Sequence, residues 1–368
     1  MDTQRRYSLW LAFAMGDRLK HHSYLLEEYG DAQQVFYAAR SGEIQPRNRL
    51  DEAFLPLLKS KATETYTDRC LAYLEKNSIR VVLPTDENYP ALLKEIHLPP
   101  TVLYVKGNLP DNIPLPIGMI GSRQCSEYGA EVAEMLAAEL AASGVCVVSG
   151  LAHGIDCISA RAAIENAPKG SFATIAVLGS GVDVVYPAEN RQLYNRICEC
   201  GAVISEFPPG TSPDKGNFPR RNRIISGISK GVLVVEAAVK SGTRITVDYA
   251  LEQGRDVFAV PGRIKDETCR GTNEMIRDGI AKLVNGAEDI LVEYGVDASE
   301  VKRAAEVDIS ALSLNEMLIV NLLKASKRTV DELGEMTGMD MGLLNSTLTE
   351  MEFSGIIKIG RASCRERV

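Results

Sequence analysis

The sequence predicts an α/β protein built on a doubly wound, mostly parallel sheet, with a small all-α N-terminal domain and a winged-helix-like C-terminal domain. Between about residues 115 and 295, short β-branched runs alternate with helical stretches, which is typical of a parallel sheet covered by helices on both faces. The runs are nearly all apolar, as burial on both sides requires. They are Ile117–Ile120, Val145–Ser149, Thr174–Leu178, Ala202–Ile204, Val232–Val235 and Val257–Val260.

Length and composition indicate an ordinary globular protein of two or three domains. The chain has 368 residues, of which 45% are hydrophobic and 24% charged, and its formal net charge is −8. The apolar stretch Leu9–Met15 is too short to span a membrane, and no later run of about 20 apolar residues occurs. We therefore expect a cytoplasmic protein.

Changes in the sequence pattern predict the domain boundaries. Apolar residues at helical spacing come first, and two β-rich runs, Val81–Leu83 and Val102–Val105, read as a lead-in packed against the central domain. A charged segment follows the last strand and precedes three short helical segments. The predicted divisions are a helical, SAM-like module at 1–75, the sheet domain at 76–295, a linker at 296–310, a winged-helix-like domain at 311–358 and a tail at 359–368.

The three C-terminal helical segments fit a helix-turn-helix of winged type with a tight turn at Gly338, although a plain three-helix bundle is the alternative. The third segment, from Met341 to Gly355, has no Lys or Arg and carries Glu350 and Glu352. Because DNA phosphates repel carboxylates, we expect this domain to contact protein rather than DNA.

The tail, IGRASCRERV, matches a translated sequencing-adapter read. It also does not continue into the hairpin that a winged domain needs after GIIKI. We therefore predict that residues 359–368 are an assembly artefact and that the natural C-terminus is missing.

The cysteines and histidines form no metal-binding pattern. Only Cys198 and Cys200 lie close together among the eight cysteines, without a second pair or a nearby histidine. The four histidines form no HExxH-type set. We expect thiols in a reducing compartment, with no metal and no cofactor.

The segment Lys215–Arg223, KGNFPRRNR, gathers cations in an acidic protein. Such a cluster indicates a local anion, for which phosphate is the commonest candidate, and Phe218 can offer a stacking face to a base. The alternative is a solvated helix start with scattered charges. Composition alone does not separate the two interpretations.

Four predicted strands lead into glycine-bearing turns, which in a doubly wound sheet lie at the carboxyl edge where ligands bind. Glycine permits close backbone approach, and each following helix start offers N–H groups to a phosphate. Arg123 adds a charge with a forked donor geometry. The turns contain Gly121, Ser122 and Arg123; Ser149 and Gly150; Gly179, Ser180 and Gly181; and Ser241, Gly242 and Thr243.

Four carboxylates near strand ends, Asp156, Asp183, Glu206 and Glu236, are candidate acids or bases. No nucleophile, metal set or nucleotide fingerprint accompanies them. We expect Asp156 to lie at a helix N-terminus, and Glu206 or Glu236 to pair with basic residues. The sequence therefore predicts a protein that is not an enzyme.

Seven motifs in order resemble the DNA-processing protein A (DprA, also called Smf) family, over roughly residues 80–295. They are MIGSRQCSEYG, VVSGLAHGID, AVLGSGVDVVYPAEN, SEFPPGT, NFPRRNRIISG, VVEAAVKSGTRITVDYALEQGRDVFAVPG and PGRIKDETCRGTNEMIRDGIAKLV. The helical N-terminus and the C-terminal helical domain also look like that family's accessory domains.

The resemblance implies an extended Rossmann-like core without enzymatic activity, which binds single-stranded DNA, protects it and loads the recombinase RecA in natural transformation. It implies a homodimer formed through this core, on a surface overlapping the one for RecA. Its DNA contacts correspond here to Gly121, Ser122, Arg123, Lys215, Phe218, Arg221, Asn222 and Arg223.

Within the basic segment, we expect Lys215, Phe218 and Arg221 to contact the ligand, while Asn222 and Arg223 hold the loop to an acidic residue. The chain departs from the family at two positions. His153 stands where the family often has Arg or Lys, and Arg161 where it often has His. The detailed role of the loop in GLAHGID therefore stays open.

Two other functions remain as alternatives. The chain has Ser241-Gly242-Thr243 where enzymes resembling cytokinin-activating phosphoribohydrolases have a PGGxGTxxE nucleotide-binding turn, but it lacks the double glycine and the following Glu. The second alternative is a scaffold protein with a winged-helix partner surface and no affinity for DNA.

Overall fold

The computed structural model describes residues 3–16, 18–47, 49–296, 312–326, 328–353, 356–359 and 364–366. The chain divides into two compact units, Met1–Val296 and Asp297–Val368. Of the predicted linker at 296–310, all but Val296 lies outside the described residues. In the part of the chain that is described, every helix is too short or too polar to cross a membrane.

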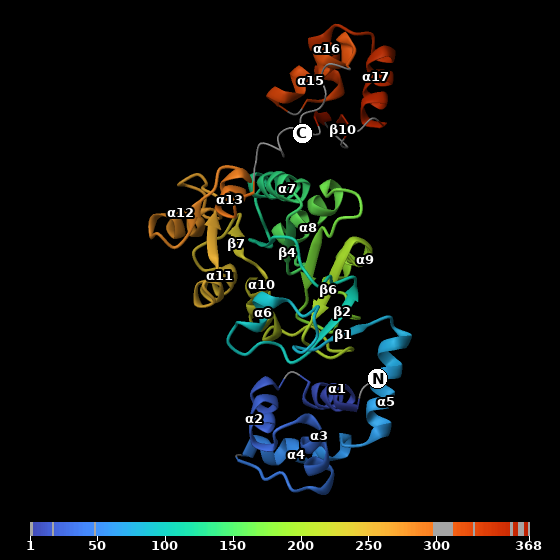
Figure 1. The fold of residues 1–368 in the computed structure, drawn as a ribbon. Helices are drawn as coiled ribbons and strands as arrows, with labels where there is room; N and C mark the ends of the chain where they lie inside the picture. Colours follow the sequence, from blue (N-terminus) through green and yellow to red (C-terminus); the bar gives the residue numbers. More distant parts are fainter. Residues whose placement is uncertain are drawn as a thin grey trace. The chain divides into compact units, whose positions relative to one another are not determined.

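The first unit, whose ribbon is drawn in Figure 1, is built on a sheet. This sheet has nine strands in the order β1-β2-β6-β5-β4-β3-β7-β8-β9. Strands β3 to β9 pair in parallel, whereas β1 and β2 are antiparallel at the β6 side. The predicted doubly wound α/β fold is thus confirmed. The strands are β1 Arg80–Val82, β2 Leu103–Gly107, β3 Pro116–Ile120, β4 Cys146–Ser149, β5 Thr174–Val177, β6 Gly201–Ser205, β7 Gly231–Val234, β8 Asp256–Ala259 and β9 Lys282–Leu283.

The lead-in runs are part of this sheet rather than a separate layer packed against it. Val81 pairs with Tyr104, and Tyr104 in turn pairs with Ser205 of β6. The antiparallel pair therefore extends the parallel sheet by two strands. All residues of β3 to β7 are buried, which explains their apolar sequences.

Helices cover both faces of the sheet, and alternate residues of a strand face the two layers. Ile175 and Val177 of β5 lie in the core cluster that contains α10 and α11 residues, whereas Ala176 lies in the cluster with α8 and α9 residues. The helices are α6 Ala91–Lys94, α7 Glu127–Ala142, α8 Ile155–Asn166, η1 Ala188–Asn190, α9 Arg191–Cys200, α10 Asn217–Ile228, α11 Thr243–Glu252, α12 Arg270–Arg277 and α13 Glu288–Glu293.

The strand order reverses between β3 and β7. The chain leaves β3 toward β4, β5 and β6, and it returns through α10 to place β7 on the other side of β3. At such a switch point, the loops after the two central strands diverge to opposite faces and leave room for a ligand.

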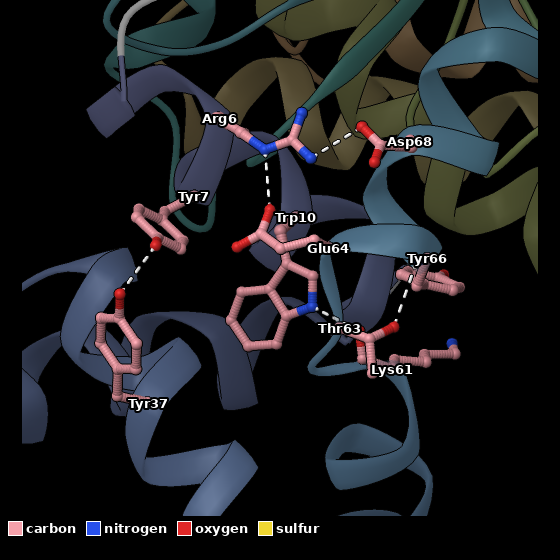
Figure 2. Close-up of polar contacts among 9 residues, drawn as sticks. All are labelled: Arg6, Tyr7, Trp10, Tyr37, Lys61, Thr63, Glu64, Tyr66 and Asp68. Atoms are coloured by element: carbon pink, nitrogen blue, oxygen red, sulfur yellow. Dashed lines mark hydrogen bonds and ion pairs between the residues drawn. The ribbon is translucent and has the colours of Figure 1, made fainter.

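The N-terminal helices are α1 Thr3–Met15, α2 Leu19–Tyr29, α3 Ala32–Ser41, α4 Arg49–Lys61 and α5 Glu64–Lys76. Trp10 is fully buried among them, and its indole Nε1 donates to the carbonyl of Lys61 at 2.8 Å (Figure 2). Beside it, Arg6 pairs with Glu64 and Asp68, which ties α1 to α5.

The other face of α1 packs on the sheet domain. Leu9 and Phe13 lie in one cluster with Leu83, Val102 and Tyr104, which come from the first two strands and their flanks. The rings of Phe13 and Tyr104 are stacked, with centroids 6.3 Å apart. The N-terminal helices therefore share a core with the sheet domain.

The second unit contains α15 Leu314–Ala325, α16 Val330–Thr337 and α17 Met341–Phe353. Capping boxes start α15 and α16, and Gly338, with a φ of +66°, ends α16. Their core contains Ile319, Val320, Leu333 and Leu344. The three predicted helices are therefore present and pack on one another.

The expectation that no hairpin follows these helices is wrong. Strand β10, Ile357–Ile359, pairs antiparallel with β11, Cys364–Glu366. The pairing is made by backbone groups, so the polar residue types of the tail did not reveal it. Residues 360–363 and 367–368 lie outside the described residues, and the artefactual origin of 359–368 stays a prediction.

We predict that Phe13→Ala lowers the free energy of unfolding of the first unit by about 3 kcal/mol, because a cavity opens where α1 meets Tyr104. Chemical denaturation followed by circular dichroism measures this change. Leu57→Ala is the control, since Leu57 is 44% exposed. Equal effects of the two substitutions would contradict a shared core.

Candidate functional site

The first two glycine turns touch each other at the switch point. The N–H of Ser122 donates to the carbonyl of Glu236 at 2.8 Å, and the N–H of Ile155 donates to the carbonyl of Ser122 at 3.2 Å. Gly154 has a φ of +71°, and a Cβ there would lie 2.2 Å from the Ser122 carbonyl oxygen. Only glycine permits this contact between the loops after β3 and β4.

The N-terminal part of α10, which carries the basic segment, lies against the second and third turns. A Cβ on Gly150 would lie 2.4 Å from the guanidinium of Arg221, and one on Gly179 would lie 2.8 Å from the ring of Phe218. The structure thus brings together the turns at 121–123, 149–150 and 179–181 with the basic segment, as the sequence predicts.

The fourth turn follows β7, the neighbour of β3, but it is less closely joined to the others. The Oγ of Ser241 accepts from the N–H of Thr243 at 3.2 Å, and α11 begins at Thr243. Among the described residues, the hydrogen bonds of Ser241, Gly242 and Thr243 stay within this turn and its helix. The predicted contribution of this turn to a ligand site remains a prediction.

Two arginines of the basic segment are bound to Glu206. Arg223 is buried and its Nη2 forms an ion pair with Oε2 of Glu206, while Nε of Arg220 lies 3.4 Å from Oε1. Burial lowers the pKa of Arg223, and the Glu206 carboxylate opposes this shift. The prediction that an acidic residue anchors Arg223 is confirmed. This residue is Glu206 and not Glu236.

Arg221 is also buried, with 4% of its surface exposed. Its Nη1 donates to the carbonyls of Gly150, at 2.7 Å, and Val177, and its Nε donates to Oδ1 of Asn222 at 3.2 Å. Burial lowers the pKa of Arg221 to about 10, although Asp156 opposes the shift. Arg221 therefore joins α10 to the ends of β4 and β5, and its predicted contact with a ligand stays untested.

The candidate catalytic carboxylates have structural partners. Asp156 lies in the first turn of α8, as predicted, and accepts from the N–H groups of Gly150 at 3.0 Å and Ala152 at 3.4 Å. Burial raises the pKa of Asp156, while Arg221 and these N–H groups lower it.

The carboxylates of Glu236 and Asp183 also accept hydrogen bonds from other parts of the protein. Glu236 is fully buried and accepts from the N–H and Oγ of Ser126, at 3.0 and 2.9 Å, at the start of α7. Asp183 accepts from the hydroxyl of Tyr73 at 2.7 Å and the N–H of Gly210 at 2.8 Å. These carboxylates hold turns and helix starts in place.

Arg123 of the first turn and Lys215 of the basic segment are candidate cations for a ligand. Arg123 and Lys215 are both exposed, and neither has an ion-pair partner among the residues that the structure describes. The guanidinium carbon of Arg123 lies 5.5 Å from the ring centroid of Phe218, which is half-buried. Arg123 thus lies beside an aromatic ring, and Lys215 precedes that ring by three residues in the chain.

Sequence reasoning missed one residue here. Tyr186 lies in the loop after the third turn, and its ring centroid is 5.5 Å from that of Phe218. Its place in the motif VVYPAEN, shortly after a glycine turn, is the only signal that the sequence offers.

Residues 80–295 match the family model described as DNA recombination-mediator protein A. This chain belongs to that family. DNA processing protein DprA of Streptococcus pneumoniae is 45% identical over 210 residues, which cover 57% of this chain and 72% of that protein. Protein Smf of Escherichia coli is 37% identical over 295 residues, which cover 78% of this chain and 77% of that protein.

Solved structures of two family members superpose on this chain. DprA of S. pneumoniae superposes with a TM-score of 0.65 at 35% identity, covering 78% of this chain and 97% of that one. DprA of Helicobacter pylori, whose structure was described for its unique single-stranded DNA binding mode, gives 0.51 at 29% identity, covering 59% and 95%. The predicted Rossmann-like core and DNA processing in recombination are thereby supported for this family member.

We predict that Glu206→Gln lowers the free energy of unfolding by about 3 kcal/mol, because it leaves the buried Arg223 without its counter-charge. Urea denaturation at neutral pH measures the loss. Glu189→Gln provides the control, since Glu189 is 74% exposed on its side chain. A Glu206 variant as stable as the control would show that this buried pair is not needed for folding.

Proposed function

We propose that this protein is a single-stranded DNA-binding recombination mediator, which protects the strand and loads RecA onto it. The observation that carries the proposal is the exposed Arg123, whose guanidinium carbon lies 5.5 Å from the ring centroid of Phe218 at the carboxyl edge of the sheet, with the exposed Lys215 on the same basic segment as Phe218. The single-stranded DNA binding described for the H. pylori relative supports it.

The chemistry of the edge suits a single strand better than a duplex. Cations and free N–H groups at helix starts bind phosphates, and aromatic rings bind the faces of bases that a duplex keeps stacked. Arg123 and Phe218 offer both kinds of group to the proposed site, while Arg221 binds the carbonyl of Gly150 and Glu206 pairs with Arg223 of α10.

We propose a cytoplasmic homodimer formed through the Rossmann-like core, with RecA bound on an overlapping surface. In the C-terminal unit, α17 bears no Lys or Arg, and Met341 and Leu343 are 43% and 48% exposed. An uncharged or acidic helix with exposed apolar side chains favours a protein partner for this unit.

We propose no enzymatic role. The phosphoribohydrolase-like alternative needs an acidic residue that can reach a bound nucleotide. Glu236, the candidate for that role, is fully buried and bound to Ser126. Its carboxylate supports the start of α7 instead.

We predict that Arg123→Ala and Lys215→Ala each weaken binding to a thymidine oligomer about fivefold at low salt, since each removes a phosphate contact. Each should also make the plot of log affinity against log salt less steep, by about 0.7. Fluorescence anisotropy measures both. Arg196→Ala, which removes a 43% exposed cation from α9, is the charge-matched control.

Arg221→Ala provides a further comparison. Because its guanidinium satisfies buried carbonyls of Gly150 and Val177, its loss should weaken binding and lower stability together. Unchanged binding in Arg123→Ala and Lys215→Ala would refute the assignment of this edge.

We also predict that the protein accelerates assembly of RecA filaments on single strands already covered by single-strand-binding protein. Arg123→Ala should lose most of this effect, because a mediator must hold the strand to deliver RecA to it. Electron microscopy of filaments, or ATP hydrolysis by RecA, reports the result. If the wild-type protein binds the strand but does not accelerate filament assembly, the loading role is refuted, while the proposed DNA binding still stands.

A further inference from the structure

We propose that Tyr186, beside Phe218, provides a further aromatic face on which a DNA base stacks. This inference rests on the proposed binding of single-stranded DNA and names the residue that receives a base. It assigns a binding role to the loop between β5 and η1.

The ring of Phe218 has three close neighbours within the protein. The backbone of Gly179 lies so close that a Cβ there would be 2.8 Å from the Phe218 ring. The guanidinium of Arg123 lies 5.5 Å from the ring centroid, and the Tyr186 ring lies 5.5 Å away at an interplanar angle of 31°. Phe218 is accordingly half-buried.

Tyr186, in contrast, is 47% exposed. Three other tyrosines are similarly exposed in the described residues, and each uses its hydroxyl within the protein. Tyr37 bonds to Tyr7, Tyr73 to Asp183, and Tyr128 to the carbonyl of Pro261. Among the residues that the structure describes, the Tyr186 hydroxyl has no such partner, and its ring contacts one other ring, that of Phe218.

The backbone around Tyr186 is nevertheless anchored. The Oγ of Ser180 donates to the carbonyl of Val184 at 2.9 Å, and Nδ2 of Asn190 donates to the carbonyl of Leu151 at 3.0 Å. Pro187 and Asn190 are buried. A ring held at the surface by an anchored loop loses little conformational entropy when a base stacks on it.

The charges indicate how a strand would lie. Arg123 flanks Phe218 on one side, whereas the loop of Tyr186 leads to the exposed carboxylate of Glu189, whose Oε2 lies 3.9 Å from Nε2 of His153. A phosphate is attracted to Arg123 and repelled by Glu189. We therefore expect a phosphate of the strand to lie near Arg123, and the attached base to lie near Tyr186.

The test compares Tyr186→Leu and Tyr186→Phe on two probes of equal length, a thymidine oligomer and the same sugar–phosphate chain with every base removed. Tyr186→Leu should weaken binding of the thymidine oligomer about fivefold or more, as expected for the loss of one stacked base, and leave binding of the abasic chain unchanged. Tyr186→Phe, which keeps the ring, should match the wild type on both. Tyr37→Leu, at an equally exposed tyrosine, is the matched control.

The outcomes separate this inference from the proposed function. If the wild type binds the thymidine oligomer and Tyr186→Leu binds it equally well, Tyr186 does not stack on a base. If the variant loses affinity for both probes alike, the residue supports the fold or the phosphate contacts, and the stacking role is again overturned. A wild type without affinity for either probe overturns the proposed function and this inference with it.

Discussion

The buried guanidinium of Arg221 is the interaction on which the arrangement of the site depends. It donates to the carbonyls of Gly150 and Val177, at the ends of two neighbouring strands, from α10, which packs against β3, β4 and β5. A charge in this position costs desolvation free energy, which the carbonyls and the nearby Asp156 offset. Removing the guanidinium would leave buried acceptors unsatisfied just below the glycine turns.

This arrangement explains why a basic segment does not produce an equally basic surface. Arg221 and Arg223 are turned into the protein, and Arg220 pairs with the same carboxylate as Arg223. Lys215 is the exposed cation of the segment without an ion-pair partner in the described part of the chain, and Arg123, from a different turn, complements it. The segment therefore supplies buried side chains that hold the loops of the proposed site, as well as exposed side chains that can contact a ligand.

The sequence predicted the sheet well, because buried parallel strands must be apolar throughout and their runs agree closely with β3 to β8. It also predicted that the turns meet at one edge, since parallel topology alone requires this. It could not show which arginine points inward, because that depends on carbonyls distant in the chain. Tyr186 was missed since one exposed aromatic in a loop has no periodic pattern, and the β10–β11 hairpin was missed because its pairing is made by the backbone.

The close contacts of the glycine turns also bear on the speed of binding. Backbone-to-backbone contacts such as that of Gly154 with Ser122 leave these loops little room to move, so the proposed site has a firmly held backbone before a strand arrives. If strands bind at the proposed site, their rate of association would then be set by diffusion and by attraction to the exposed cations. Selectivity among strands would consequently be expressed in how long each one stays bound, rather than in how fast it is found.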